Sequence, residues 1–250
     1  MNGEIRAGVG MNRTGTMMSP IDSAEAREGA HDLTNPSEGD TRELANNRIL
    51  YMKESDPIGS IPMPVTPKGI FSAVKGKMMT GSNVFLDKLG ERIAFERAGT
   101  RLYEALISKY QGTMNKKNLP PIKLIEQFHH EELLHFYMLT DVMTELGGDP
   151  TAVTPAADVA GVAAMGWVKI ITDPRTTFSQ SLEIILQAEL VDNASWELLI
   201  DLADSVGLDE LSKQFSKALE EEEVHLQHVK QWVTQLHLSG NSEINSKTRH

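Results

Sequence analysis

The chain of 250 residues carries a formal net charge of −11 and contains no cysteine. The missing cysteine excludes disulfides, thiolate metal sites and cysteine-held iron–sulfur clusters, and the negative charge argues against a nucleic-acid partner. Neither a secretion signal nor a stretch long and apolar enough to span a membrane is recognisable, so we expect a cytoplasmic protein with no membrane partner.

Residues 1–82 differ in composition from the rest and are predicted to form an N-terminal extension. Residues 1–40 are rich in Gly, Ser, Asn, Thr and charge, which is typical of disorder or of an extended arm. A short helix is expected over Thr41–Lys53, and the prolines of Pro57–Pro67 favour extended backbone. We expect the short amphipathic segment 69–79 to pack on the main domain or on a neighbouring subunit.

Four long amphipathic helices are predicted over residues 83–238, at about 83–110, 121–146, 177–205 and 209–238. The connections after the first and third helices are short and predict two antiparallel hairpins. The connection at 151–175, with a short apolar helix of its own, is long enough to cross the length of a bundle. The expected fold class is therefore all-α, and residues 239–250 form a polar tail.

Each of the four helices has an apolar seam that is interrupted by ionisable residues. Their order is Glu, Glu-x-x-His, Glu, Glu-x-x-His, at Glu96, Glu132, His135, Glu189, Glu222 and His225. Helical residues three apart share a face, so each Glu-x-x-His places both side chains on one seam. A buried carboxylate is costly unless it is paired or bound to metal. A bundle held by ion pairs alone is disfavoured, because no Lys or Arg lies on these seams.

This order of residues resembles that of the ferritin-like di-iron and di-manganese carboxylate superfamily. The resemblance covers about residues 83–238, rests on all six positions, and implies a ferritin-like four-helix bundle. It also implies two bound divalent metal ions, whose charge would balance the four carboxylates. Carboxylate and imidazole donors favour Fe, then Mn, with Zn as a possible substitute.

Two further polar residues lie near the six. Asp192 follows Glu189 by three positions, and an Asp beside a metal-bound His commonly accepts the hydrogen bond of its outer ring N–H. Tyr103 follows Glu96 by seven positions and is placed either to donate to a ligand carboxylate or simply to fill the interior. We expect Asp192 and Tyr103 to support the metal ligands.

Two other Glu-x-x-His steps are predicted not to bind metal. Glu126 and His129 share a seam with polar residues and begin only a turn or so inside the second helix. Glu28 and His31 lie in the N-terminal extension without an apolar seam.

The expected function is that of a non-haem dimetal oxidoreductase that activates O2 or peroxide, with the dimetal centre itself as the catalytic group. The alternatives are a di-manganese catalase, ferritin-type iron storage and a metal-binding protein without turnover. Without cysteine there is no rubredoxin-like domain, so any electron donor would be a separate molecule. We expect a small homo-oligomer, most simply a dimer.

Overall fold

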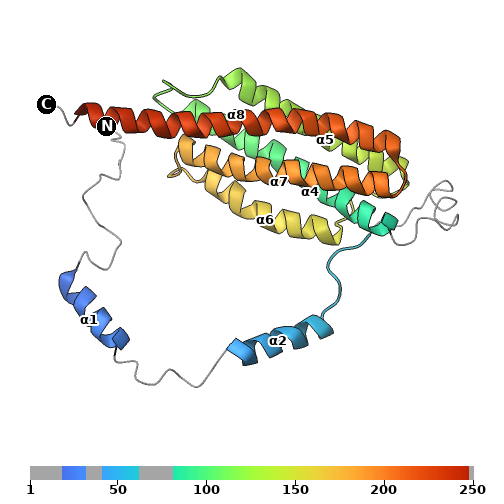
Figure 1. Ribbon diagram of the computed structural model, residues 1–250, viewed down its shortest axis with the longest axis horizontal. Helices are drawn as coiled ribbons and strands as arrows, with labels where there is room; N and C mark the ends of the chain where they lie inside the picture. Colours follow the sequence, from blue (N-terminus) through green and yellow to red (C-terminus); the bar gives the residue numbers. More distant parts are fainter. Residues whose placement is uncertain (1–18, 32–40, 62–80, 248–250) are drawn as a thin grey trace. The chain divides into compact units, whose positions relative to one another are not determined.

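The computed structural model describes residues 19–31, 41–61 and 81–247, and every regular element within these ranges is an α-helix (Figure 1). The chain divides into two units, Met1–Asp56 and Pro57–His250, which are described separately. In the described part of the chain, no helix combines the length and apolarity needed to cross a membrane.

The first unit contains α1, Pro20–His31, and α2, Thr41–Glu54. The second of these helices lies where the sequence predicts it. The first was not predicted, since residues 1–40 were expected to be disordered or extended. Its helical form is favoured by Asp22 in the first turn and His31 in the last, which suit the helix dipole. The predicted segment 69–79 lies outside the described residues.

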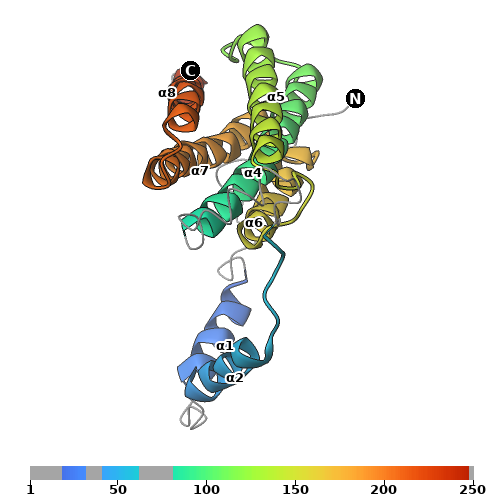
Figure 2. The same ribbon diagram turned by 90° about the vertical axis from the view of Figure 1, so that its right-hand side faces the viewer.

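The second unit contains five helices: α4, Gly81–Gly112; α5, Ile122–Glu145; α6, Pro155–Thr172; α7, Phe178–Ser205; and α8, Asp209–Lys247. Helix α4 packs against α5, α6 and α7, and α7 packs against α8 (Figures 1 and 2). Because short connections join α4 to α5 and α7 to α8, each pair forms an antiparallel hairpin. The segment between the hairpins carries α6, as predicted, but α6 is a long helix of 18 residues.

Local signals in the sequence account for the helix ends. Thr177 and Gln180 form a reciprocal capping box at the start of α7. Gly147 and Gly207 follow α5 and α7 with φ of 84° and 76°, a backbone conformation that glycine adopts without steric cost. Helix α8 differs from the prediction, because it continues to Lys247 through part of the expected polar tail.

Two apolar clusters fill the interior of the second unit. One contains Phe128, Ile185 and Trp232, and the other contains Leu139 and Trp196. On α5, α7 and α8, the predicted ionisable residues fall between the stretches that supply the two clusters, and on α4 Glu96 directly follows Phe95, near the point where one cluster gives way to the other. The fold therefore gathers these residues at one level, enclosed by apolar side chains on both sides.

Candidate metal centre

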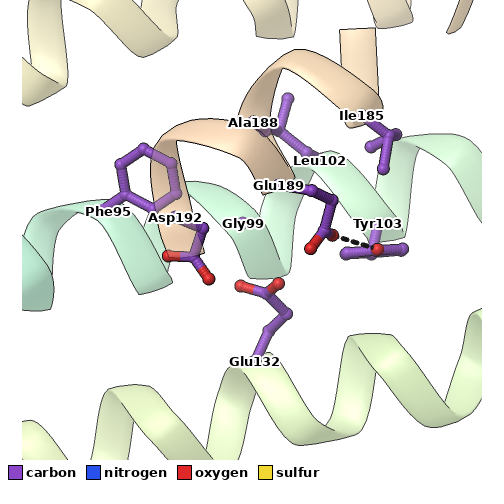
Figure 3. Close-up of a pocket in the computed structure, with 9 residues that line it drawn as sticks. All are labelled: Phe95, Gly99, Leu102, Tyr103, Glu132, Ile185, Ala188, Glu189 and Asp192. Atoms are coloured by element: carbon purple, nitrogen blue, oxygen red, sulfur yellow. Dashed lines mark hydrogen bonds between the residues drawn. The ribbon is translucent and has the colours of Figure 1, made fainter. Parts of the chain in front are cut away.

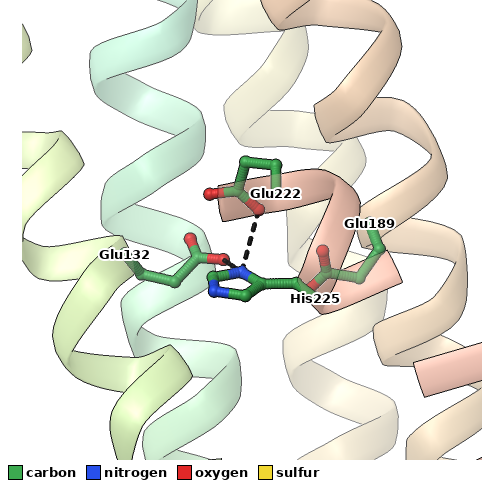
Figure 4. A group of neighbouring side chains, drawn as sticks. All are labelled: Glu132, Glu189, Glu222 and His225. Atoms are coloured by element: carbon green, nitrogen blue, oxygen red, sulfur yellow. Dashed lines mark hydrogen bonds and ion pairs between the residues drawn. The ribbon is translucent and has the colours of Figure 1, made fainter. Parts of the chain in front are cut away.

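The six residues of the predicted ligand set converge at this level from four helices. Their exposed fractions are at most 4%, for Glu96, Glu132, His135, Glu189, Glu222 and His225. Figure 4 shows four of them, from α5, α7 and α8, pointing toward one another. Residues far apart in sequence thus form one buried cluster of carboxylates and imidazoles.

Within the described residues, the donor atoms form two groups, each lying within 4.8 Å of one another. The first group consists of Glu96, His135 and Glu222. The second consists of Glu132, Glu189, Glu222 and His225. Each group contains one histidine, and Glu222 belongs to both, so the cluster has two candidate ion positions with a shared carboxylate.

The carboxylate of Glu222 lies between the two imidazoles. Its Oε1 is 2.7 Å from His135 Nδ1, and its Oε2 is 3.0 Å from His225 Nδ1. The other carboxylates stand further off, with Glu96 Oε2 3.8 Å from His135 Nδ1 and Glu132 Oε1 3.9 Å from His225 Nδ1. One oxygen of Glu222 thus faces each histidine, an arrangement suited to a carboxylate that bridges two ions.

The outer nitrogens of the two histidines have carboxylate partners in a reciprocal pattern. His135 Nε2 on α5 lies 2.9 Å from Glu221 on α8, and His225 Nε2 on α8 lies 2.8 Å from Glu131 on α5. A carboxylate acceptor at Nε2 places the ring proton there and leaves the Nδ1 lone pair directed at the cluster. The sequence prediction gave this role to Asp192, which instead pairs with an arginine.

That arginine, Arg92, is a residue that the sequence analysis missed. Its Nη2 donates to Glu96 Oε1 and to Asp192 Oδ1, and its side chain is 1% exposed. The guanidinium carbon lies 4.8 Å from the ring centroids of Phe95 and Trp196. No Lys or Arg was found on the apolar seams, and Arg92 indeed lies off the seam of α4, but it precedes Glu96 by one helical turn and pairs with two of the buried carboxylates.

Tyr103 also contacts the cluster, donating a hydrogen bond from its hydroxyl to Glu189 Oε1 (Figure 3). The acceptor is on α7, whereas Tyr103 is on α4, so the bond joins the two hairpins. Burial, followed by the charges of Glu189 and Glu132, raises the pKa of Tyr103, which keeps its hydroxyl protonated as a donor.

Burial also dominates the electrostatics of the carboxylates. It raises the pKa of Glu96 from 4.5 to about 8, with Asp192 adding to the effect and Arg92 opposing it. The pKa values of Glu132, Glu189 and Glu222 are raised well above 4.5 for the same first reason. Burial lowers the pKa of His135, which favours its neutral form. The cluster therefore either takes up protons or binds cations.

The unpartnered atoms of the cluster test whether metal ions fit. Each of the four glutamates has one buried oxygen without a hydrogen-bond partner, and the inner nitrogen of one histidine also has none: Glu96 Oε2, Glu132 Oε2, Glu189 Oε2, Glu222 Oε1 and His135 Nδ1. The last two atoms lie 2.7 Å apart but do not form a hydrogen bond with each other. Buried polar atoms normally have partners. Five buried carboxylates against one guanidinium leave a formal charge of −4 in the described interior, which two divalent cations would balance. The residues present therefore fit two such ions.

A small cavity adjoins the carboxylates between α4 and α7 (Figure 3). Its volume of about 10 Å³ is close to that of one water molecule. Gly99 helps to line it, and a Cβ at this position would overlap Glu132 Oε2. A glycine in the middle of a long helix is the signal that could have identified this close approach.

The two competing Glu-x-x-His steps do not join the cluster. Glu126 is exposed, His129 is half-buried, and neither belongs to a group of potential metal donors in the described residues. Glu28 and His31 are exposed on α1. Burial, rather than the motif alone, distinguishes the two pairs in the core from the other two.

Oxygen and imidazole donors around a water-sized cavity form a combination suited to divalent transition-metal ions. No protein-family model, curated protein or solved structure matched this chain. The residues described above are therefore the whole basis on which a function can be assigned.

Proposed function

We propose that this chain is a non-haem dimetal carboxylate protein of the ferritin-like type, with α4, α5, α7 and α8 as its bundle. The observation that carries the proposal is the convergence of unpartnered buried donor atoms into two groups that share Glu222. The ions would be Fe or Mn. Zn, which has no redox chemistry of its own, would be a substitute.

The proposed activity is that of an oxidoreductase acting on O2 or peroxide. When bound, a pair of Fe or Mn ions would supply the redox chemistry. The protein would hold the ions through the six converging residues, while Glu131 and Glu221 orient the two imidazoles. The apolar clusters above and below would exclude water and so strengthen the electrostatic interactions at the centre.

A second candidate is a peroxide-only reaction of the di-manganese catalase type. The cavity of about 10 Å³ favours it, because that volume admits a molecule the size of water or peroxide and not an organic substrate. Both candidates use the same residues, and they differ in the metal and in the oxidant consumed.

The test is to load the metal-free protein with Fe(II) or Mn(II) under nitrogen, measure bound metal by elemental analysis, and then follow O2 and peroxide consumption. We expect two ions per chain and consumption of at least one oxidant. Glu222→Gln, which alters the residue common to both groups, should reduce both binding and activity. Glu126→Gln, at an exposed site on α5, is the matched control and should change neither.

The same preparations distinguish the other functions considered. Chains that bind no metal would disprove the dimetal proposal. Uptake of hundreds of irons by a large hollow assembly, seen by light scattering, would favour storage. Two bound ions that consume neither oxidant would favour a binding role without turnover.

A further inference from the structure

The two ion positions differ in the charges that surround them. Arg92 donates to Glu96, which belongs only to the first group, and to Asp192, which belongs to neither. Its charge also acts on the pKa of Glu132 in the second group, but without a hydrogen bond to that residue among those of the described part of the chain. Because Arg92 is almost fully buried, solvent screens its charge little. A divalent ion at the first position would therefore lie close to a fixed cation, although the carboxylate of Asp192, which pairs with Arg92, offsets part of this charge.

The number of available donors also differs. The first group has three residues and the second has four. Arg92 occupies Glu96 Oε1 by a hydrogen bond, so only Oε2 of this carboxylate is free. In the second group, Tyr103 occupies Glu189 Oε1 in a similar way, but the hydroxyl carries no charge that would repel an ion.

The position of Arg92 is fixed on several sides. It is held by Asp192 from α7 and lies against the rings of Phe95 and Trp196. Although burial alone would lower the pKa of Arg92, the charges of Asp192 and Glu96 raise it, so the guanidinium stays positive. The side chain is thus a permanent internal cation at one end of the cluster.

Building on the dimetal function proposed above, we propose that Arg92 makes the two positions unequal. The ion that binds first occupies the second group, which consists of Glu132, Glu189, Glu222 and His225. The ion that binds second occupies the first group, Glu96, His135 and Glu222, and binds more weakly. Arg92 acts as a positioning residue that limits Glu96 to one free oxygen and sets the affinity of the second step.

The inference can be tested by titrating the metal-free protein with Mn(II) under nitrogen in a calorimeter. The wild type should show two separate steps. Arg92→Gln removes the charge but keeps hydrogen-bonding capacity. It should tighten the second binding step more than the first, so that the gap between the two steps, measured as the ratio of their dissociation constants, falls by about tenfold or more. Arg92→Lys keeps the charge and should keep the gap.

Glu96→Gln provides an independent test that leaves Arg92 in place. It should remove or weaken the second step while the first remains. Two equal steps in the wild type, an unchanged gap in Arg92→Gln, or loss of the first step in Glu96→Gln would each overturn the inference. A wild type that binds fewer than two ions would instead overturn the dimetal proposal. Circular dichroism of each variant confirms that it is folded.

Discussion

Glu131 and Glu221 immediately precede two candidate ligands, yet each contacts the histidine of the opposite helix. Glu131 also accepts a hydrogen bond from Gln127 Nε2 at 2.8 Å, which fixes its carboxylate from the solvent side. Burial tends to raise the pKa of Glu131, but the hydrogen bonds from His225 and Gln127 and the charges of the two histidines together outweigh it, so the pKa is lowered and the group stays ionised. An ionised acceptor at Nε2 makes the inner nitrogen a better metal donor.

We therefore expect Glu131→Ala and Glu221→Ala each to weaken metal binding by about 10- to 100-fold, the usual effect of removing an outer partner of a metal ligand. A competition titration with a chelator of known affinity would measure the change. Glu223→Ala, an exposed neighbour on α8, is the matched control and should have no effect. Equal losses in the control and in the two test variants would mean that general charge, and not histidine orientation, sets the affinity.

Substitution of Gly99 should affect metal binding without a matching effect on the stability of the fold. In Gly99→Ala the new Cβ would overlap Glu132 Oε2, and the mobile end of this side chain must move to make room. Alanine is also the better helix former, by about 1 kcal/mol. We expect weaker metal binding with little loss of stability in the metal-free protein, measured by metal titration and urea denaturation.

The control for this substitution is Gly161→Ala on α6, where a Cβ would meet nothing within 4 Å. It should stabilise the protein by about 0.5–1 kcal/mol and leave metal binding unchanged. Unaltered metal affinity in Gly99→Ala would show that Glu132 does not need its present position to bind an ion.

At the scale of the helix, Thr154 ties the start of α6 to α4. Its hydroxyl accepts from Ala157 N as an N-cap and donates to the carbonyl of Asp87 at 3.0 Å. The Asp87 side chain in turn accepts from Ala156 N at 2.9 Å. Gly90 allows this approach, since a Cβ there would lie 2.6 Å from Thr154 Oγ1. One buried hydroxyl thus serves two helices.

Thr154→Ala should lower the free energy of unfolding by about 2 kcal/mol, because it removes a helix cap and also the hydrogen bond by which this hydroxyl ties α6 to the Asp87 carbonyl. Thr177→Ala removes only the exposed cap of α7 and should cost about 1 kcal/mol. Urea denaturation measures both values, and Thr154→Ser should retain most of the stability. A smaller loss at Thr154 than at Thr177 would contradict the proposed double role.

How far the elements could be predicted depended on local signals. Pro155 and Gly207 mark helix ends that the structure also shows. By contrast, the polar composition of α1 carries little apolar periodicity, and its helix was missed. The same lack of a seam beyond Leu238 hid the extension of α8 to Lys247.

For the site, apolar seams were sufficient to place six buried residues at one level, because each seam reports which face of its own helix is buried. They do not report which neighbour a side chain meets. Arg92 was missed because it lies off the predicted seam of α4, and Asp192 was assigned to a histidine although its partner is Arg92. Contacts across helices, such as that of Glu131 with His225, depend on helix rotation and offset, which a single sequence does not specify.

For the molecule as a whole, the buried carboxylates couple stability to pH. The pKa of Glu96 is about 8 in the folded chain, whereas that of an unburied glutamate is 4.5. The pKa values of Glu132 and Glu189 are also raised. At a pH between these two pKa values of Glu96, the folded state holds protons that the unfolded state has released. The stability of the metal-free protein therefore falls as pH rises through this window.

Metal ions should reverse the pH trend, because they replace the protons and hold the carboxylates ionised. We predict that the melting temperature of the metal-free protein falls between about pH 5 and pH 8, and that added Mn(II) raises it more at pH 8 than at pH 5. Thermal denaturation with and without metal across this range measures both effects. Glu96→Gln cannot ionise at this position, so the metal-free variant should show a shallower fall than the wild type. A metal-free protein that becomes more stable toward pH 8, or one that Mn(II) stabilises equally at both ends, would contradict a proton-for-metal exchange in the core.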